Sequence, residues 1–196
     1  MDITFYITVA GNSSRMKYDK ANLALGEYTF LERMTHAIKK IGYSPILVTK
    51  ESENTKYGLH SISDNNPQIG PLGGLYQSLK HAPTSYVCYL SCDIPLFPTQ
   101  VLQALANHAK GLPCTVVSFK ERLYPLIGIY HKCILPVITN QIQNGNYKMM
   151  DFLERINKQI YPVDAWIHDE ILLNCNKPED LEKLKAYFVM ENKSPD

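Results

Sequence analysis

The chain has 196 residues, of which 45% are hydrophobic and 20% are charged, so it can bury a core and does not have the composition of a disordered protein. Its formal net charge of +1 provides no overall field to gather nucleic acid or an anionic membrane, and neither is expected as a partner. No apolar run has the length of a membrane span, and the N-terminus lacks the basic-then-apolar pattern of a secretion signal. The cytoplasm is therefore the expected location.

The cysteines and histidines predict no cross-linked or zinc-bound framework. The five cysteines are odd in number and widely spread, with no Cys-x-x-Cys pair, which favours reduced thiols. Cys88 and Cys92 are expected to act as small buried hydrophobic residues. The six histidines are equally scattered and none shows the spacing of zinc ligands.

The first expected strand, residues 3–10, is a run of β-branched and aromatic residues that suits a buried position. It ends at Gly11, where a loop of short side chains begins and continues through Arg15 to Lys20. Such a loop lets backbone N–H groups close around phosphate oxygens, while the arginine and the lysine supply positive charge. The loop is therefore predicted to hold a nucleotide.

The remaining elements follow in alternation along the chain. Strands are expected at residues 45–48, 61–64, 86–90, 114–119, 126–130 and 160–163, and helices at 29–41, 71–79, 99–109, 136–143, 149–156 and from 178 onward. Thr29 and Glu32 have the spacing of a capping box, Pro71 suits the first position of its helix, and Thr99 is expected to cap the next helix. Residues 50–60 are expected to form an irregular surface segment.

Strands that alternate with helices predict an α/β fold with a mostly parallel sheet, in which ligands bind beyond the carboxyl ends of the strands. Gly11, Asp64 and Asp93 follow the first, third and fourth strands and are expected to meet there. The strand at 126–130 is expected to be antiparallel because its connection is short. Without a linker or a repeat, residues 1–196 are interpreted as one domain, with a nucleotide-binding half (1–110) and an acceptor-binding half (111–196).

Two common nucleotide motifs, G-x-x-x-x-G-K-[ST] and G-x-G-x-x-G, are absent. Four other motifs follow one another instead: VAGNSSRMKYDK from Val9, GPLGG from Gly70, CDIP from Cys92, and NCNKPEDL from Asn174. In this order they resemble the molybdenum cofactor guanylyltransferases, which belong to the glycosyltransferase-A-like nucleotidyltransferases. The resemblance runs over nearly the whole chain. It implies a three-layer α/β/α fold with a Rossmann-like sheet.

The resemblance also implies a Mg²⁺-dependent activity, in which GMP is transferred from GTP to the phosphate of molybdopterin and pyrophosphate is released. Val9, Ala10 and Gly11 would contact the nucleotide through their backbone. Thr49 lies near a position that contacts the base in the family, and Asp64 would contact the guanosine. Transient contact with proteins that insert the cofactor into enzymes is a further expectation of the resemblance.

The resemblance implies that three further residues bind the phosphates and the metal ion. Lys20 would bind the nucleotide phosphates, Arg15 would bind the leaving pyrophosphate, and Asp93 would bind both the nucleotide and Mg²⁺. Asn174 and Asn176 match an asparagine pair near the molybdopterin substrate. The residue chemistry agrees, because nucleotidyl transfer needs charge neutralisation and positioning, and Mg²⁺ is often held by a single protein carboxylate with phosphate oxygens.

Alternatives remain open at this stage. Asp93 could cap a turn, and Asn174 and Asn176 could be helix N-caps. Asn12 and Lys17 stand where the family has glycines, so a catalytically weak nucleotide-binding accessory protein is one alternative. A cytidylyltransferase or a sugar-phosphate nucleotidyltransferase of the same fold is another.

Overall fold

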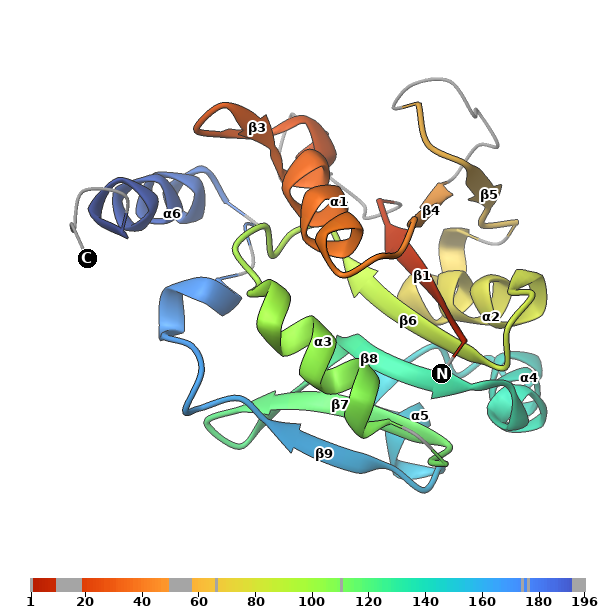
Figure 1. The fold of residues 1–196 in the computed structure, drawn as a ribbon. Helices are drawn as coiled ribbons and strands as arrows, with labels where there is room; N and C mark the ends of the chain where they lie inside the picture. The colour runs from red at the N-terminus through yellow and green to blue at the C-terminus, as the bar shows by residue number, and fades with distance from the viewer. Residues whose placement is uncertain are drawn as a thin grey trace.

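The computed structural model describes residues 2–9, 19–49, 58–65, 67–109, 111–173, 175 and 177–191. Over these ranges, seven strands form one sheet in the order β5-β4-β1-β6-β8-β7-β9 (Figure 1). The strands are β1 (Ile3–Thr8), β4 (Ile46–Thr49), β5 (Ser61–Ser63), β6 (Tyr86–Ser91), β7 (Cys114–Phe119), β8 (Arg122–His131) and β9 (Gln159–Pro162). A separate small hairpin consists of β2 (Ala24–Leu25) and β3 (Tyr28–Thr29).

The sheet is parallel except for one strand. β1 pairs in parallel with β4 and β6, β4 with β5, and β7 with β9. β8 runs antiparallel between β6 and β7. The predictions of a mostly parallel sheet and of an antiparallel strand at 126–130 are confirmed. All the parallel strands therefore end at the same edge of the sheet, where the sequence predicts the ligand site.

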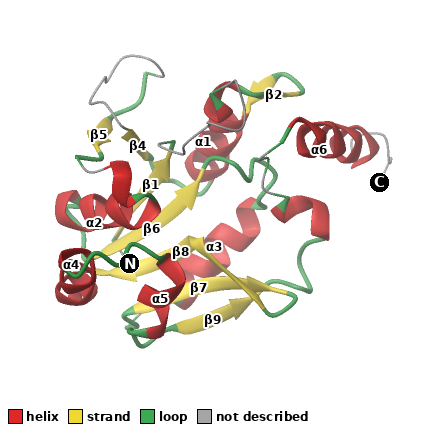
Figure 2. Cartoon of the chain, turned by 180° about the vertical axis from the view of Figure 1, so that it is seen from behind, coloured by secondary structure: helices red, strands yellow, loops and turns green. Residues whose placement is uncertain are grey.

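Helices cover both faces of the sheet. They are α1 (Phe30–Lys40), α2 (Pro71–His81), α3 (Thr99–His108), α4 (Leu135–Gln143), α5 (Met149–Glu154) and α6 (Pro178–Glu191). The buried side chains of α1 and α3 join one hydrophobic cluster, and those of α2, α4 and α5 join a second cluster on the opposite face. Figures 1 and 2 show these two helix layers from the front and from behind. The expected three-layer α/β/α architecture is confirmed.

The position of β1 inside the sheet, between β4 and β6, explains why its sequence is almost continuously apolar. Phe5 and Ile7 pack into the cluster with α1 and α3, whereas Tyr6 packs into the cluster with α2 and α4. A parallel strand that is covered on both faces needs apolar side chains on both sides. The absence of strict alternation in residues 3–9 is a consequence of this position.

Local signals set most helix starts. Thr29 and Glu32 form the predicted capping box, because the Thr29 hydroxyl accepts from the Glu32 N–H and the Glu32 carboxylate accepts from the Thr29 N–H. Pro71 begins α2 as predicted. The prediction for Thr99 is wrong, since this residue is the first of α3 and Pro98 occupies the cap position. The Pro98 carbonyl accepts from the N–H groups of Val101 and Leu102, and no side-chain cap is made because the proline ring has no acceptor atom.

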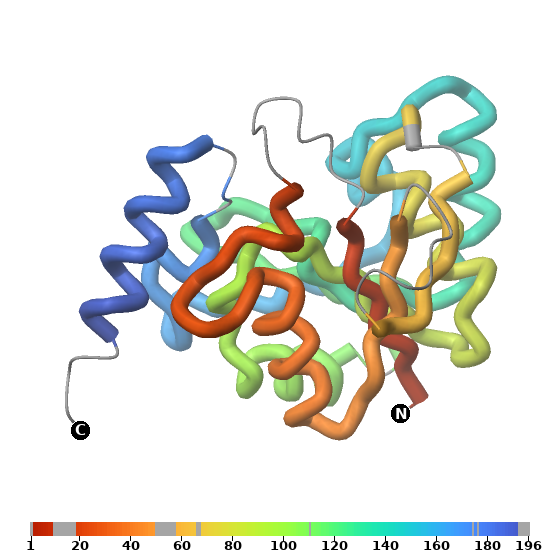
Figure 3. The backbone as a smooth tube through the Cα atoms, turned by 90° about the horizontal axis from the view of Figure 1, so that it is seen from above, coloured from red at the N-terminus to blue at the C-terminus, as the bar shows by residue number. Residues whose placement is uncertain are grey.

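Helix α6 packs beside a segment from the first part of the chain. In Figure 3, α6 lies next to the segment that carries the β2–β3 hairpin. The ring of Phe188 approaches Gly26 in the hairpin, and the Arg33 guanidinium lies over the same ring at 4.2 Å from its centroid. Leu184 anchors the helix in a small cluster with Leu25 and Phe30. Residues 50–57, predicted to be irregular, lie outside the described residues.

None of the helices in the described ranges is both long enough and apolar enough to span a bilayer.

Candidate functional site at the carboxyl ends of the strands

The edge formed by β1, β4 and β6 is held together beyond the last strand residues. The Val9 N–H donates to the Val48 carbonyl at 3.0 Å, and the Cys92 N–H donates to the Thr8 carbonyl at 3.3 Å. Because pairing persists to the end of the strands, the residues that follow them leave the sheet from fixed positions. Val9 and Asp93 are the two predicted site residues that these bonds place.

Lys20 and Asp93 form an ion pair at this edge, with 3.7 Å between Nζ and Oδ2. Only 15% and 18% of the two side chains are exposed. Lys20 begins a short 3-10 helix, and Asp19 caps it by accepting from the Ala21 N–H at 3.1 Å. Pairing is what makes two largely buried charges tolerable, and both groups stay within reach of a polar ligand. The structure thus joins the two predicted phosphate and metal residues.

A third segment reaches Asp93 from the far end of the sequence. The Cys175 N–H donates to the Asp93 carbonyl at 3.4 Å, and the Cys175 side chain is buried beside Leu25 and Leu184. Cys175 stands between Asn174 and Asn176 in the predicted acceptor motif. The backbone contact therefore fixes the centre of that motif next to the residue proposed for the metal.

Two buried thiols lie close to the ion pair and are chemically inert at neutral pH. Burial raises the pKa of the Cys92 thiol to about 12, and the charge of Asp93 adds to the rise while Lys20 opposes it. Burial raises the pKa of the Cys175 thiol to about 11, with Asp180 adding to the rise and Lys20 opposing it. Both sulfurs stay protonated at neutral pH, so neither is a nucleophile. The expectation that Cys88 and Cys92 are buried is confirmed.

Asp64 and Thr49 occupy the next two strand ends. Asp64 is 2% exposed, and its N–H donates to the Thr49 carbonyl at 2.7 Å. A buried carboxylate at the mouth of a parallel sheet is an acceptor for N–H donors of a bound molecule. Its position follows from the parallel pairing of β4 with β5.

Several predicted site residues lie outside the described residues. These are Ala10, Gly11, Arg15, Asn174 and Asn176, together with the glycine replacements Asn12 and Lys17.

Two residues of this edge were not singled out from the sequence. Asp19 caps the helix that carries Lys20, and an aspartate directly before a short helical segment is a signal that could have indicated this. Tyr89 is buried behind Asp64, and nothing in its sequence context distinguishes it from other core residues.

The donor set at this edge fits a hard cation that is shared with a ligand. Within the described ranges, no group of three or more histidine, cysteine, aspartate or glutamate side chains could hold a metal ion alone. Asp93 supplies one carboxylate beside a lysine. Mg²⁺ is typically bound by one or two carboxylates together with phosphate oxygens and water, so this set is compatible with Mg²⁺ on a nucleotide.

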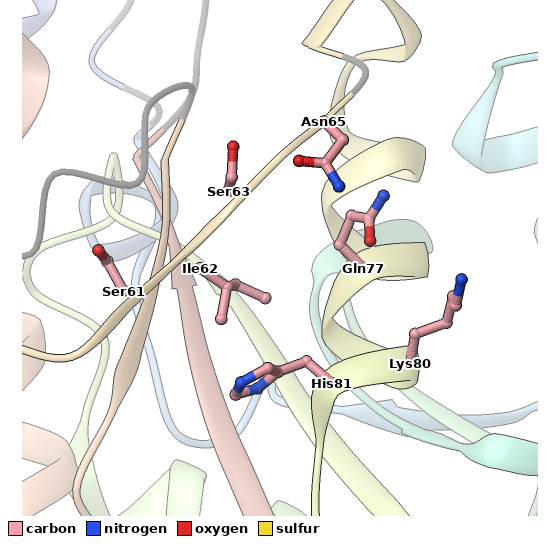
Figure 4. Close-up of a pocket in the computed structure, with 7 residues that line it drawn as sticks. All are labelled: Ser61, Ile62, Ser63, Asn65, Gln77, Lys80 and His81. Atoms are coloured by element: carbon pink, nitrogen blue, oxygen red, sulfur yellow. The ribbon is translucent and has the colours of Figure 1, made fainter.

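A separate cavity of about 390 Å³ lies between β5 and α2. Figure 4 shows Ser61, Ile62, Ser63 and Asn65 along one wall and Gln77, Lys80 and His81 projecting from α2 along the other. Nδ1 of His81 lies 2.9 Å from the Tyr6 hydroxyl. Asp64 is not part of the lining, although Ser63 and Asn65 on either side of it are. The cavity therefore adjoins the site without sharing its charged residues.

Comparison with known sequences identifies relatives over the whole chain. A model of the MobA-like NTP transferase domain matches residues 5–160. A relative from Flavobacterium johnsoniae, named "Probable molybdenum cofactor guanylyltransferase", is 36% identical over 93% of this chain and 96% of its own length. A relative of the same name from Carboxydothermus hydrogenoformans is 32% identical over 97% of this chain and 98% of its own length.

A solved structure confirms the fold. The crystal structure of molybdopterin-guanine dinucleotide biosynthesis protein A from Archaeoglobus fulgidus matches with a TM-score of 0.81 and covers 95% of this chain and 99% of its own. The sequence identity is 20%, so this likeness concerns the architecture.

Proposed function

The chain belongs to the family of MobA-like NTP transferases, and on that premise we propose that it is a guanylyltransferase that joins GMP from GTP to the phosphate of molybdopterin. Two relatives that match almost end to end carry the name of this activity. The observation that carries the proposal is the Lys20–Asp93 pair at the carboxyl ends of β1 and β6, with Cys175 bonded to the Asp93 backbone.

The nucleotide-binding half, residues 1–110, supplies the contacts to GTP. Val9, Ala10 and Gly11 offer their backbone at the end of the central strand. Asp64 accepts from the guanosine, and Thr49 lies beside the base. Support comes from the shared strand ends and from the Asp64–Thr49 backbone bond, which keeps these two residues adjacent.

Two basic side chains and one carboxylate bind the triphosphate and its metal ion. Lys20 and Arg15 bind the triphosphate, and Arg15 stabilises the pyrophosphate as it leaves. Asp93 holds Mg²⁺, which when bound neutralises phosphate charge and orients the reacting oxygens. The short distance between Lys20 and Asp93 supports this division, because a bound triphosphate and its cation would meet both residues at once.

The acceptor-binding half, residues 111–196, brings molybdopterin to the same edge. Asn174 and Asn176 bind the acceptor on either side of Cys175, whose N–H is bonded to the Asp93 carbonyl. An acceptor held there lies next to the proposed phosphate site. The same surface is proposed to meet cofactor-insertion proteins transiently, and the reaction is proposed to take place in the cytoplasm.

The chemistry is an in-line displacement at the α-phosphorus of GTP. An oxygen of the molybdopterin phosphate forms a bond to this phosphorus, and the bond to the oxygen that bridges the α- and β-phosphates breaks, which releases pyrophosphate. The attacking phosphate is already anionic at neutral pH, so no general base is needed. The protein contributes positioning and charge neutralisation, which are the main requirements of such a transfer.

Calorimetry of GTP and CTP binding in the presence of Mg²⁺ tests the nucleotide. We expect GTP to bind at least tenfold more tightly, and a clear preference for CTP would refute the guanylyl assignment. Pyrophosphate release with GTP and molybdopterin tests the reaction. If GTP binds and no pyrophosphate is released, the enzyme assignment is wrong and the chain is a nucleotide-binding accessory protein.

A further inference from the structure

A buried tyrosine links the end of one strand to the start of a helix beside the proposed nucleoside site. Tyr89 is fully buried on β6, on the face of the sheet that α2 covers. Its hydroxyl donates to the Pro71 carbonyl at 3.1 Å, and it also forms a hydrogen bond with the side chain of Thr8. Thr8 ends β1, and Pro71 begins α2. One hydroxyl thus links the strand before the nucleotide loop to the start of the GPLGG helix.

The same hydroxyl lies close to Asp64. Burial raises the pKa of the Tyr89 hydroxyl, and the negative charge of Asp64 raises it further, while the Thr8 hydrogen bond lowers it. The side chain is therefore neutral at any physiological pH, and its hydroxyl keeps the proton that it donates to the Pro71 carbonyl. Asp64 itself is 2% exposed, and its backbone N–H is bonded to the Thr49 carbonyl, so its main chain is held against the end of β4.

Helix α2 is shaped to receive this hydroxyl. A Cβ atom at Gly74 would fall within 3.0 Å of the Tyr89 oxygen, a distance that real Cβ atoms do not show. A glycine inside a helix costs about 1 kcal/mol relative to alanine. The helix begins after Gly70, whose φ of 71° also favours glycine. Both glycines therefore serve to bring the first turn of α2 against Tyr89.

We propose that Tyr89 is a positioning residue for the nucleoside of the bound nucleotide, acting through Asp64 and the first turn of α2. The inference rests on the proposed function, in which Asp64 accepts from the guanosine. Tyr89 touches neither the phosphates nor the acceptor, because Lys20, Asp93 and Cys175 form a separate cluster. It therefore sets nucleotide affinity and base preference and leaves the chemical step and the binding of the acceptor unchanged.

A second buried tyrosine provides a matched control. Tyr130 is also fully buried, belongs to the same hydrophobic cluster, and donates its hydroxyl to a proline carbonyl, that of Pro125, at 2.6 Å. Tyr89→Phe and Tyr130→Phe each remove one buried hydroxyl and keep the ring. A purely structural role for both tyrosines predicts similar losses of stability and equal effects on ligand binding.

The test compares wild type, Tyr89→Phe and Tyr130→Phe in the full-length protein. For Tyr89→Phe we expect the Kd for Mg·GTP in calorimetry to rise about tenfold, because the hydroxyl no longer holds the first turn of α2 in place beside Asp64, and the preference for GTP over CTP to shrink. The KM for GTP should rise while kcat and the KM for molybdopterin stay within about twofold. Tyr130→Phe should match wild type in all five quantities.

Equal GTP affinity in the two variants, with a wild type that binds GTP, would overturn the inference and leave the proposed function intact. A wild type that binds no GTP would overturn the proposed function, and the inference with it. If Tyr89→Phe does not fold, Thr8→Val takes its place, since it removes the other hydrogen bond to the same hydroxyl at nearly constant volume. An unchanged Kd for Mg·GTP in Thr8→Val would then overturn the inference.

Discussion

Gly74 has no room for a methyl group while Tyr89 carries its hydroxyl. In Gly74→Ala, the new Cβ would overlap the Tyr89 oxygen, whereas its distances to the Tyr89 Cζ and to Val48 Cγ1 would be an ordinary 3.4 Å. Tyr89 is fully buried and cannot swing away, so the surrounding core has to shift. Overpacking of this kind costs about 1–3 kcal/mol, and the better helix propensity of alanine returns up to about 1 kcal/mol. We expect a net loss of about 1–2 kcal/mol in the free energy of unfolding.

Gly74→Ala should no longer lower the free energy of unfolding when the Tyr89 hydroxyl is removed. Tyr89→Phe alone should lower the free energy of unfolding by about 1–3 kcal/mol, because the Pro71 carbonyl loses its buried partner. In that background, the atom that the new Cβ would overlap is absent, and Gly74→Ala should be neutral or stabilising by up to about 1 kcal/mol. The coupling between the two substitutions should then be about 2 kcal/mol.

Urea unfolding of the four proteins in this double-mutant cycle, followed by circular dichroism, measures these quantities. The cycle compares Gly74→Ala with and without one oxygen atom, so the change in helix propensity cancels in the coupling. If Gly74→Ala has the same sign and size in both backgrounds, the close packing of Tyr89 against α2 is not what excludes a side chain at residue 74.

Three further outcomes follow from the site and its surroundings. Asp93→Ala should abolish pyrophosphate release from Mg·GTP and molybdopterin while circular dichroism stays unchanged; retained turnover would contradict its metal role. Thr29→Ala should lower the free energy of unfolding in urea by about 1 kcal/mol through loss of the capping box, and an unchanged value would contradict the contribution of the cap. The free energy of unfolding should fall as the pH rises from about 9 to 11. In the unfolded chain the thiols of Cys92 and Cys175 have a pKa of about 9, whereas in the folded chain the pKa of Cys92 is about 12 and that of Cys175 about 11, so only the unfolded chain loses these protons in this range. The fall should be shallower in Cys175→Ala, and a slope equal to that of wild type would contradict the raised pKa.

The strand ends at the candidate site were predictable because each is marked by residues next to it in the sequence. A parallel sheet brings carboxyl ends together, so Lys20 and Asp93 could be assigned to one edge although 72 residues lie between them in the chain. The capping box of Thr29 and Glu32 was predictable for the same reason, since both partners lie within one turn.

Features that depend on packing between elements were beyond sequence reasoning. The Tyr89–Gly74 contact depends on which face of β6 meets which turn of α2, and no spacing in the sequence reports this. The early part of β8 was missed because Pro125 normally argues against a strand. The pairing of β7 and β8 shifts register between Val116 and Val117, where their partners are Gly128 and Tyr124, and Pro125 falls in the resulting bulge.

The position of β1 between two later strands has a consequence for how the chain is made. β1 is synthesised first, but its parallel partners are β4 at residues 46–49 and β6 at residues 86–91. The centre of the sheet therefore cannot close until the ribosome has released β6, whereas the β7–β8 hairpin pairs neighbouring residues and can form within microseconds of its synthesis. Throughout that interval, the apolar residues of Ile3–Thr8 lack their final cover. The strand that organises the finished enzyme is thus open to aggregation and to chaperones until β6 has been made.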